Sequence, residues 1–220
     1  DGSLIASGCR ATSADQAQIL LWDTSSWRVL QHLAAHQLTV TQLAFSPNGQ
    51  YLLAVSRDRT FSVFHRGETN GPFELAMRSD KTNGVHTRII WCCDWSHDSE
   101  LFATGSRDGK VVAWIASEKD QQAGSAFVQR SVLELKNESI TAVAFARKKL
   151  QDGRYLVAVG LETGVIKLYG LGQWDLLFTI TEAHAHHMTV KRLSFRPHEE
   201  SHQLASCGED GFVRVYGLKL

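Results

Sequence analysis

The chain has 220 residues, enough for one large all-β domain or two small ones. Its 23 Lys and Arg residues balance 23 Asp and Glu residues, which argues against a protein that holds nucleic acid or an acidic membrane by bulk electrostatics. No apolar run of about 18 residues occurs, so the sequence predicts no transmembrane helix. The sequence begins at Asp1 and shows no signal peptide, and we expect it to be a fragment of a longer chain.

Short runs in which apolar and polar residues alternate predict half-buried β-strands in the first part of the chain. Two such runs, Leu4–Cys9 and Ile19–Trp22, flank a polar loop. The tetrapeptide Ser46–Gly49 contains Pro47 and has the composition of a turn. The following strands are predicted at Val29–Leu33, Val40–Phe45, Tyr51–Val55, Thr60–Phe64 and Phe73–Met77.

The stretch from His86 to Trp114 shows the pattern most clearly. Two alternating runs, Ile90–Trp95 and Leu101–Thr104, are joined by a polar turn, and Asp108-Gly109 then leads into Val111–Trp114. Asp-Gly between two β-rich runs is a strong hairpin signal, because glycine tolerates positive φ and the Asp side chain bonds nearby backbone. After a charged insertion at Ser117–Ser125, which we expect to be mobile, strands are predicted at Val132–Leu135, Ile140–Phe145, Tyr155–Val159, Val165–Tyr169, Leu176–Ile180, Val190–Phe195, Leu204–Cys207 and Val213–Tyr216.

This unit of strands recurs roughly every 50 residues, a period typical of WD-repeat propeller blades. An aromatic residue closes one strand of each unit, at Trp22, Phe64, Trp114, Tyr169 and Tyr216. We therefore predict an all-β WD-repeat β-propeller of about four and a half four-stranded blades, an open arc of a larger ring. The expected ranges are a half blade at 1–23 and blades at 29–64, 73–114, 132–169 and 176–216.

The WD-repeat resemblance implies a polar network inside a blade. In that family a His bonds the turn Asp, and a strand Ser or Thr links the His to a Trp. The matching residues of the clearest repeat are His86, Thr104, Asp108 and Trp114. A buried polar network stiffens a structure only when every member is satisfied, so we expect this blade to be the most rigid.

The other repeats match the network less fully. The last one offers His186, Ser206 and Asp210, with Tyr216 in place of the Trp. The repeat at 29–64 keeps His36 and Asp58 but has Ala54 and Phe64 at the other two positions. The repeat at 132–169 has Lys136, Val159, Thr163 and Tyr169, so we expect that blade to depend on apolar packing.

A converging Ser or Thr, His and Asp also suggests a hydrolase triad. The nucleophile position is Ala54 in one repeat and Val159 in another, and no nucleophile elbow or oxyanion loop is recognisable. The structural interpretation is therefore better, and we expect no enzyme activity in this chain.

The cysteines are interpreted as reduced thiols of a cytoplasmic or nuclear protein, because no disulfide framework is visible. They are Cys9, Cys92, Cys93 and Cys207. A zinc site that joins Cys92 and Cys93 to the tract His184–His187 lacks any CxxC spacing and would need long-range convergence. The sequence also lacks a Cys triplet for an iron–sulfur cluster and a phosphate-binding Gly-rich loop, so no cofactor is expected.

Several stretches go beyond the generic blade. In their order and spacing they resemble the C-terminal propeller of the family of Elongator second subunits, and the resemblance covers nearly the whole chain. The stretches are Ile19–Trp27, Leu38–Pro47, Leu52–Thr60, Val85–Trp91, Gly105–Asp108, Lys110–Trp114, Val157–Glu162 and Ala205–Asp210.

This resemblance implies a scaffold function. The family's subunit has two WD-repeat propellers in tandem and lies beside the large first subunit and the catalytic third subunit of Elongator. The complex modifies the wobble uridine of certain tRNAs, and its acetyl-CoA and radical chemistry belong to the third subunit. We therefore expect a scaffold in the cytoplasm and nucleus whose partners are those subunits, with no small-molecule ligand, no membrane and no direct tRNA contact.

A partner surface is expected on the top face of the propeller. The residue before the turn Asp commonly points there in WD-repeat proteins, as does a residue early in the inner strand. Arg57, Trp91 and Arg107 hold such positions in neighbouring blades and are predicted to form one patch, because Arg and Trp are enriched in interface hot spots. In the alternative interpretation each Arg pairs with its own turn Asp or a neighbouring loop.

Two other functions remain open at this point. The chain could be a WD-repeat adaptor of another intracellular complex, which only its partners would distinguish. It could also bind tRNA through one basic face, since such a face is compatible with a net charge of zero.

Overall fold

The computed structural model describes residues 2–68, 71–80, 84–117, 127–181, 184–197 and 202–219. These residues form an all-β fold of eighteen strands in five antiparallel sheets. Within each sheet the strands follow one another in chain order, each paired with the next. The all-β, blade-like fold class expected from the sequence is confirmed.

The first sheet and the last sheet have three strands each, and the other three sheets have four. The first two sheets comprise β1 (Leu4–Gly8), β2 (Ile19–Asp23) and β3 (Val29–Leu33), then β4 (Val40–Phe45), β5 (Tyr51–Ser56), β6 (Phe61–His65) and β7 (Glu74–Arg78). The third is β8 (Ile90–Trp95), β9 (Leu101–Ser106), β10 (Lys110–Ala116) and β11 (Phe127–Glu134). The last two are β12 (Ile140–Phe145), β13 (Tyr155–Leu161), β14 (Ile166–Leu171) and β15 (Asp175–Ile180), then β16 (Val190–Phe195), β17 (His202–Gly208) and β18 (Val213–Leu218).

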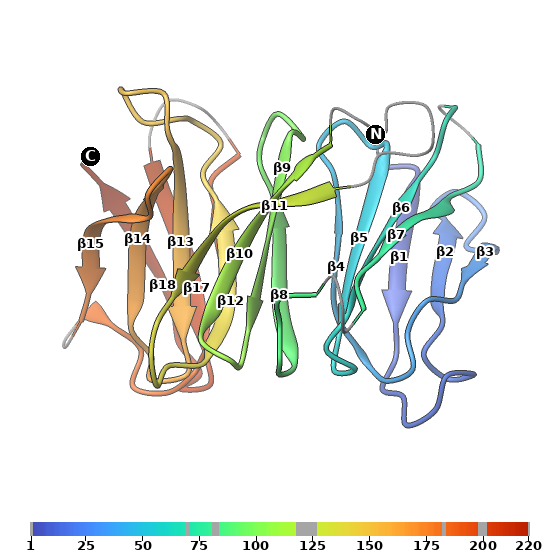
Figure 1. Ribbon diagram of the computed structural model, residues 1–220, viewed down its shortest axis with the longest axis horizontal. Coiled ribbons are helices and arrows are strands. Elements are labelled where there is room, and N and C mark those ends of the chain that lie inside the picture. Colours follow the sequence, from blue (N-terminus) through green and yellow to red (C-terminus); the bar gives the residue numbers. More distant parts are fainter. Residues whose placement is uncertain are drawn as a thin grey trace.

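The first three sheets stand side by side in chain order from the right of Figure 1 to its centre, and the fourth and fifth sheets overlap at the left of that view. The inner strands β4, β8, β12 and β16 contact one another in sequence, and β1 contacts β4. In the described part of the chain, no strand of the first sheet pairs with a strand of the last, so the sheets form an open arc.

The outer strands pair differently from the expected ranges. Each of the four full-blade ranges began with an outer strand, whereas the structure pairs that strand with the sheet before it: β3 pairs with β2, β7 with β6, β11 with β10 and β15 with β14. The sheets are therefore offset by one strand from the expected ranges. As a result the last sheet has three strands, and the first sheet has three rather than half a blade.

Tight turns explain this pairing in the first and fourth sheets. Between β2 and β3 the Oδ1 atom of Asp23 accepts hydrogen bonds from the backbone N–H groups of Ser25 and Ser26, at 3.1 and 2.6 Å. Trp27 then adopts a φ of 54°, and Trp174 has a φ of 59° in the corresponding turn between β14 and β15. Such turns fold a strand back on the one that precedes it, so the outer strand pairs locally.

The core consists of apolar layers between neighbouring sheets. The layer between the second and third sheets contains Val55, Phe61, Trp95, Phe102 and Trp114. Strand β13 is buried at every residue from Tyr155 to Leu161, because apolar layers cover both of its faces. This explains why it carries an almost continuous apolar run.

Part of the expected insertion lies outside the described residues, since 118–126 are not among them. Among the described residues, no helix is long and apolar enough to cross a membrane.

Candidate functional site

The third sheet contains the complete polar network. The two ring nitrogens of His86 contact different partners: Nε2 lies 2.8 Å from Thr104 Oγ1, and Nδ1 lies 3.3 Å from Asp108 Oδ2. Trp114 Nε1 donates to the same Thr104 Oγ1 at 3.0 Å. The structure thus brings together all four residues predicted for this blade, and the Thr104 hydroxyl joins the His to the Trp.

Asp108 connects this network to the turn. Its carboxylate accepts hydrogen bonds from the backbone N–H groups of Thr87, at 2.8 Å, and Lys110, at 3.0 Å. Burial raises the pKa of Asp108, but the hydrogen bond and charge of His86, together with the backbone hydrogen bonds from Thr87 and Lys110, outweigh that effect and lower the pKa to about 2. The carboxylate is therefore ionised at neutral pH and anchors both ends of the hairpin.

The second sheet contains a network that the sequence did not reveal. His36 Nδ1 lies 3.2 Å from Asp58 Oδ2, as expected, but Nε2 lies 2.8 Å from the hydroxyl of Ser62. Ala54, at the expected hydroxyl position of β5, is the register partner of Ser62 on β6. In this sheet the opposite strand supplies the hydroxyl. The signal in the sequence that could have revealed it is a polar residue, Ser62, paired with the apolar Ala54.

The last sheet keeps the His, Ser and Asp but not the aromatic link. His186 Nδ1 lies 2.8 Å from Asp210 Oδ1, and Nε2 lies 2.7 Å from Ser206 Oγ. The hydroxyl of Tyr216 instead donates to the backbone carbonyl of His184 at 2.7 Å. Arg214 adds an ion pair with Asp210 at 3.2 Å, so this blade uses a charged neighbour where the third sheet uses Trp114.

The fourth sheet is held by apolar contacts at the matching positions. Val159 and Tyr169 are both buried in the layer between the third and fourth sheets. Tyr169 also makes an edge contact with Trp174, with ring centroids 6.2 Å apart. This arrangement agrees with the packing expected for that blade.

The buried hydroxyls leave no room for a substrate. Thr104 and Ser62 are 0 % exposed and Ser206 is 2 % exposed, so a reactant cannot reach them. In the part of the chain that the structure describes, no group of three or more His, Cys, Asp or Glu side chains could hold a metal ion. The burial of the three hydroxyls agrees with a structural network.

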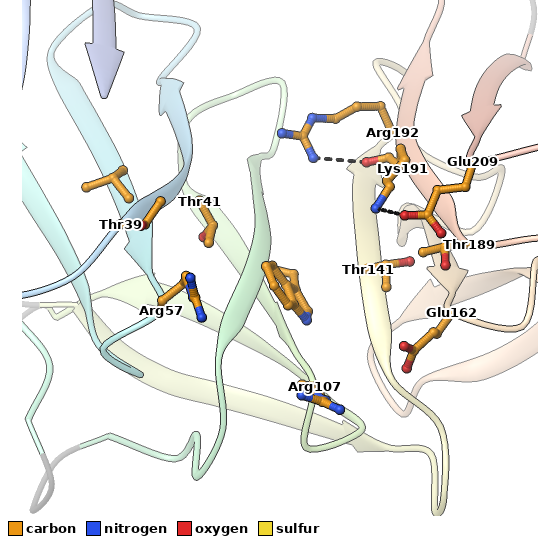
Figure 2. Close-up of a pocket in the computed structure, with 12 residues that line it drawn as sticks. Thr39, Thr41, Arg57, Arg107, Thr141, Glu162, Thr189, Lys191, Arg192 and Glu209 are labelled. Carbon is orange, nitrogen blue, oxygen red and sulfur yellow. Dashed lines mark hydrogen bonds and ion pairs between the residues drawn. The ribbon is translucent and has the colours of Figure 1, made fainter. Parts of the chain in front are cut away.

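The hollow at the centre of the arc is the best candidate for a functional site. It has a volume of about 530 Å³ and brings together the three predicted partner-binding residues, Arg57, Trp91 and Arg107. Figure 2 shows the side chains around it, with Arg57 at the left, Arg107 at the bottom, and Lys191 and Glu209 at the right of that view.

One ring of side chains in this hollow comes from β-bulges in the inner strands. The pairing of each inner strand with its neighbour skips one residue, and the skipped residues are Thr41, Trp91, Thr141 and Lys191. A bulge re-aims a side chain, and all four residues line the hollow. The bulges were not predicted from the sequence, although the identical spacing of these residues was visible there.

A second ring comes from the turns after the second strands. The backbone N–H groups of Arg57, Arg107, Glu162 and Glu209 donate to the carbonyls of Thr39, Ile89, Ser139 and Thr189 at 2.9–3.0 Å. The same hydrogen bond thus places one charged residue of each of four successive sheets at the hollow. In chain order these charges are positive, positive, negative and negative.

The charged side chains differ in whether they are paired. Lys191 forms an ion pair with Glu209, which Figure 2 marks with a dashed line. Within the described residues, neither Arg57 nor Arg107 has a side-chain hydrogen bond or an ion pair, and the same is true of Glu162. The alternative in which each Arg pairs with its own turn Asp is therefore wrong, because His36 and His86 hold those carboxylates instead.

A known protein family accounts for much of the chain. The family described as "WD domain, G-beta repeat" matches residues 27–65, 79–114 and 174–217. Those matches include the His and Asp of all three polar networks described above.

Relatives extend the similarity to the full length of the chain. Elongator complex protein 2 of Drosophila melanogaster is 53% identical over 100% of this chain, and the chain covers 28% of that protein. The Homo sapiens protein of the same name is 39% identical over 97% of the chain and 29% of its own length. The Saccharomyces cerevisiae protein is 34% identical over 83% of the chain, which spans 23% of it. The chain thus belongs to the WD-repeat family, and its resemblance to Elongator second subunits is confirmed.

Proposed function

We propose that the chain is part of a non-catalytic scaffold subunit of the Elongator complex. The observation that carries this proposal is the similarity to Elongator complex protein 2 along the whole chain. Because the chain spans less than a third of those relatives, the activity and partners of the whole protein belong to the proposal.

The proposed partners are the large scaffold subunit and the catalytic acetyltransferase-like subunit. The chain would support wobble-uridine modification of tRNA by holding these subunits, in the cytoplasm and nucleus, while the chemistry takes place in the catalytic subunit. The buried state of Thr104, Ser62 and Ser206 supports a structural contribution from this chain.

The central hollow is the proposed contact surface for a partner. Arg57 and Arg107 are exposed and make no ion pair among the described residues, and Trp91 is half-buried between them in chain order. Unpaired Arg side chains beside an accessible Trp are the groups that most often carry binding energy in an interface.

An affinity pull-down of the tagged full-length protein, followed by mass spectrometry, tests the proposal. We expect capture of the large subunit and the acetyltransferase-like subunit, and loss of at least one of them when Arg57, Trp91 and Arg107 are all changed to Ala. A matched control changes Arg10, Trp27 and Arg28, which are exposed away from the hollow, to Ala. Capture of a different complex would show that the chain is an adaptor elsewhere.

A further inference from the structure

A buried arginine lines a cavity between the first and second sheets, away from the central hollow. Arg66 is 8 % exposed and follows His65, which pairs with Tyr51 at the start of β5. Arg57 of the central hollow follows the end of β5, so the two cavities lie at opposite ends of the second sheet. This cavity, the Arg66 pocket, lies between β3 and the segment 71–73 and has a volume of about 500 Å³.

Two contacts hold the guanidinium of Arg66 in place. Its Nε donates to the carbonyl of Gly49 at 2.7 Å, and its Cζ lies 5.4 Å from the ring centroid of the buried Phe73. A cation over an aromatic face is attracted by the ring, so Phe73 fixes the plane of the guanidinium. Among the described residues, the two Nη groups have no hydrogen bond and Arg66 has no ion pair. The guanidinium is therefore oriented, but its outer edge has no partner there.

A buried cation without a counter-charge is unfavourable, because burial removes its hydration and nothing replaces it. A guanidinium presents its N–H groups as a planar fork, and this fork matches the two oxygens of a carboxylate. Since Nε of Arg66 is already used, the pair of Nη groups is the edge that remains for a carboxylate.

Most other side chains of the Arg66 pocket are apolar. Leu4, Leu21 and Leu30 line it from the first sheet, and Pro72 and Phe73 line it from the second. Pockets of a few hundred Å³ with apolar walls and a few polar groups that fix orientation are typical of small-ligand sites. The walls thus favour an apolar group attached to the carboxylate.

Two other polar side chains of the lining, Gln31 and Asp23, already have partners. Gln31 Nε2 donates to the carbonyl of Phe73 at 2.7 Å, and its Oε1 accepts from the Phe73 N–H at 2.9 Å. Asp23 Oδ1 accepts hydrogen bonds from the turn that follows it. Because Asp23 keeps a negative charge in the lining, it opposes a doubly charged phosphate more strongly than a singly charged carboxylate.

We infer that the Arg66 pocket binds a monocarboxylate with an apolar body, either a free small molecule or the apolar C-terminal residue of a protein partner. The two carboxylate oxygens accept hydrogen bonds from Nη1 and Nη2 of Arg66, and the apolar body contacts Leu4 and Leu30. The site is separate from the central hollow and does not depend on the proposed scaffold function.

The test uses the full-length protein and pairs of probes that differ only in the carboxylate. Hexanoate and hexanamide, observed by saturation-transfer NMR, represent the free ligand. Fluorescein-Gly-Ser-Gly-Leu with a free carboxyl terminus or a terminal amide, observed by fluorescence anisotropy, represents the chain terminus. We expect the acid of at least one pair to bind about tenfold more tightly than its amide, because a hydrogen bond to a charged group is the only difference. A preference in one pair alone identifies the source of the ligand.

Two variants locate the effect. Arg66→Met keeps an apolar stem over Phe73 but removes the charge, so it should abolish the preference for the acid. Arg130→Met, a matched change at an exposed position of β11, should leave the preference unchanged. Equal binding of acid and amide in both pairs, tighter binding of inorganic phosphate, or a preference that persists in Arg66→Met would overturn the inference.

Thermal unfolding separates an external ligand from a partner within the longer protein. Removal of an unpaired buried charge should leave the Tm of the ligand-free protein unchanged or raise it, whereas removal of one half of an existing pair lowers the Tm. Saturating hexanoate should raise the Tm of the wild type and not that of Arg66→Met. A lower Tm of Arg66→Met, without any preference of the wild type for an acid, would overturn the inference and assign Arg66 to a carboxylate elsewhere in the same protein.

Discussion

Ala54 of β5 and Ser62 of β6 face each other across the second sheet, and the Ser62 hydroxyl lies 2.8 Å from His36 Nε2. In the third sheet the arrangement is reversed, with Thr104 on β9 opposite Val112 on β10. Side chains directly opposite each other in an antiparallel pair are only about 5 Å apart, so either strand can supply the hydroxyl. A buried imidazole needs a partner on each nitrogen, and the fold provides it from two different positions.

We predict that Ser62→Ala destabilises the second sheet by about 1–3 kcal/mol, because it leaves a buried nitrogen of His36 without a partner. Hydrogen exchange of the β5 and β6 amides in the full-length protein measures this loss. The double variant Ser62→Ala with Ala54→Ser moves the hydroxyl to the Thr104 position and should restore most of the protection. Unchanged exchange in the single variant would contradict the prediction.

Thr104→Val should lower the free energy of unfolding by about 2–4 kcal/mol, roughly twice as much as Ser206→Ala. Thr104 Oγ1 is the partner of both His86 Nε2 and Trp114 Nε1, whereas Ser206 Oγ is the partner of His186 Nε2 and Tyr216 bonds elsewhere. Pulse proteolysis in urea compares the two variants, with Thr104→Ser as the conservative control. Equal losses would show that the Trp114 contact contributes nothing.

Acid should weaken the third sheet through Asp108. The pKa of this carboxyl falls from 3.8 to about 2 on folding: burial raises it, but the hydrogen bond and charge of His86 and the backbone hydrogen bonds from Thr87 and Lys110 together lower it further. A lowered folded pKa stabilises the protein fully above about pH 4, and the stabilisation is lost as the pH falls toward 2. We expect the free energy of unfolding to fall by about 2 kcal/mol over this range. Hydrogen exchange of the Thr87 and Lys110 amides measures this fall. Asp108→Asn should remove the dependence, and persistence of the dependence in that variant would rule out Asp108 as its source.

Asp94 should act in the opposite direction and at higher pH. Burial raises the pKa of this carboxyl to about 6, although the backbone N–H of Phe145, 2.8 Å from Oδ2, favours the charged form. A raised folded pKa means that stability falls as the pH rises from about 4 to 6 and stays lower above that. Asp94→Asn keeps an acceptor for Phe145 without the charge and should stabilise the β8–β12 contact by about 1–3 kcal/mol at neutral pH. The denaturation midpoint of the two proteins at pH 4 and pH 7 checks this, and an equal difference at both pH values would contradict it.

Much of the fold could be predicted because its signals are local. Alternation of apolar and polar residues located the strands, and Asp108-Gly109 located a hairpin, since both depend on neighbours in the chain. Arg57, Trp91 and Arg107 were also placed correctly at one hollow, because the repeat fixes equivalent positions in successive sheets.

The errors concern contacts between strands. The outer strand β3 was assigned to the following range, because its sequence does not show whether the turn at Trp27 folds it backward or forward. The alternative of an Arg57–Asp58 pair was left open, because the competition between Arg57 and His36 for that carboxylate depends on where each side chain points.

By itself the sequence determined the strand order, the blade repeat and the identity of the charged residue at each turn. The tertiary structure decided which of those charges remain unpaired, since Lys191 neutralises Glu209 while Arg57, Arg107 and Glu162 have no such neighbour among the described residues. It also decided that Ser62 completes a network and that four bulges aim side chains at one hollow. The physical reason is that register and sheet packing bring together residues far apart in the chain, and the free energy of a buried or charged group depends on those neighbours.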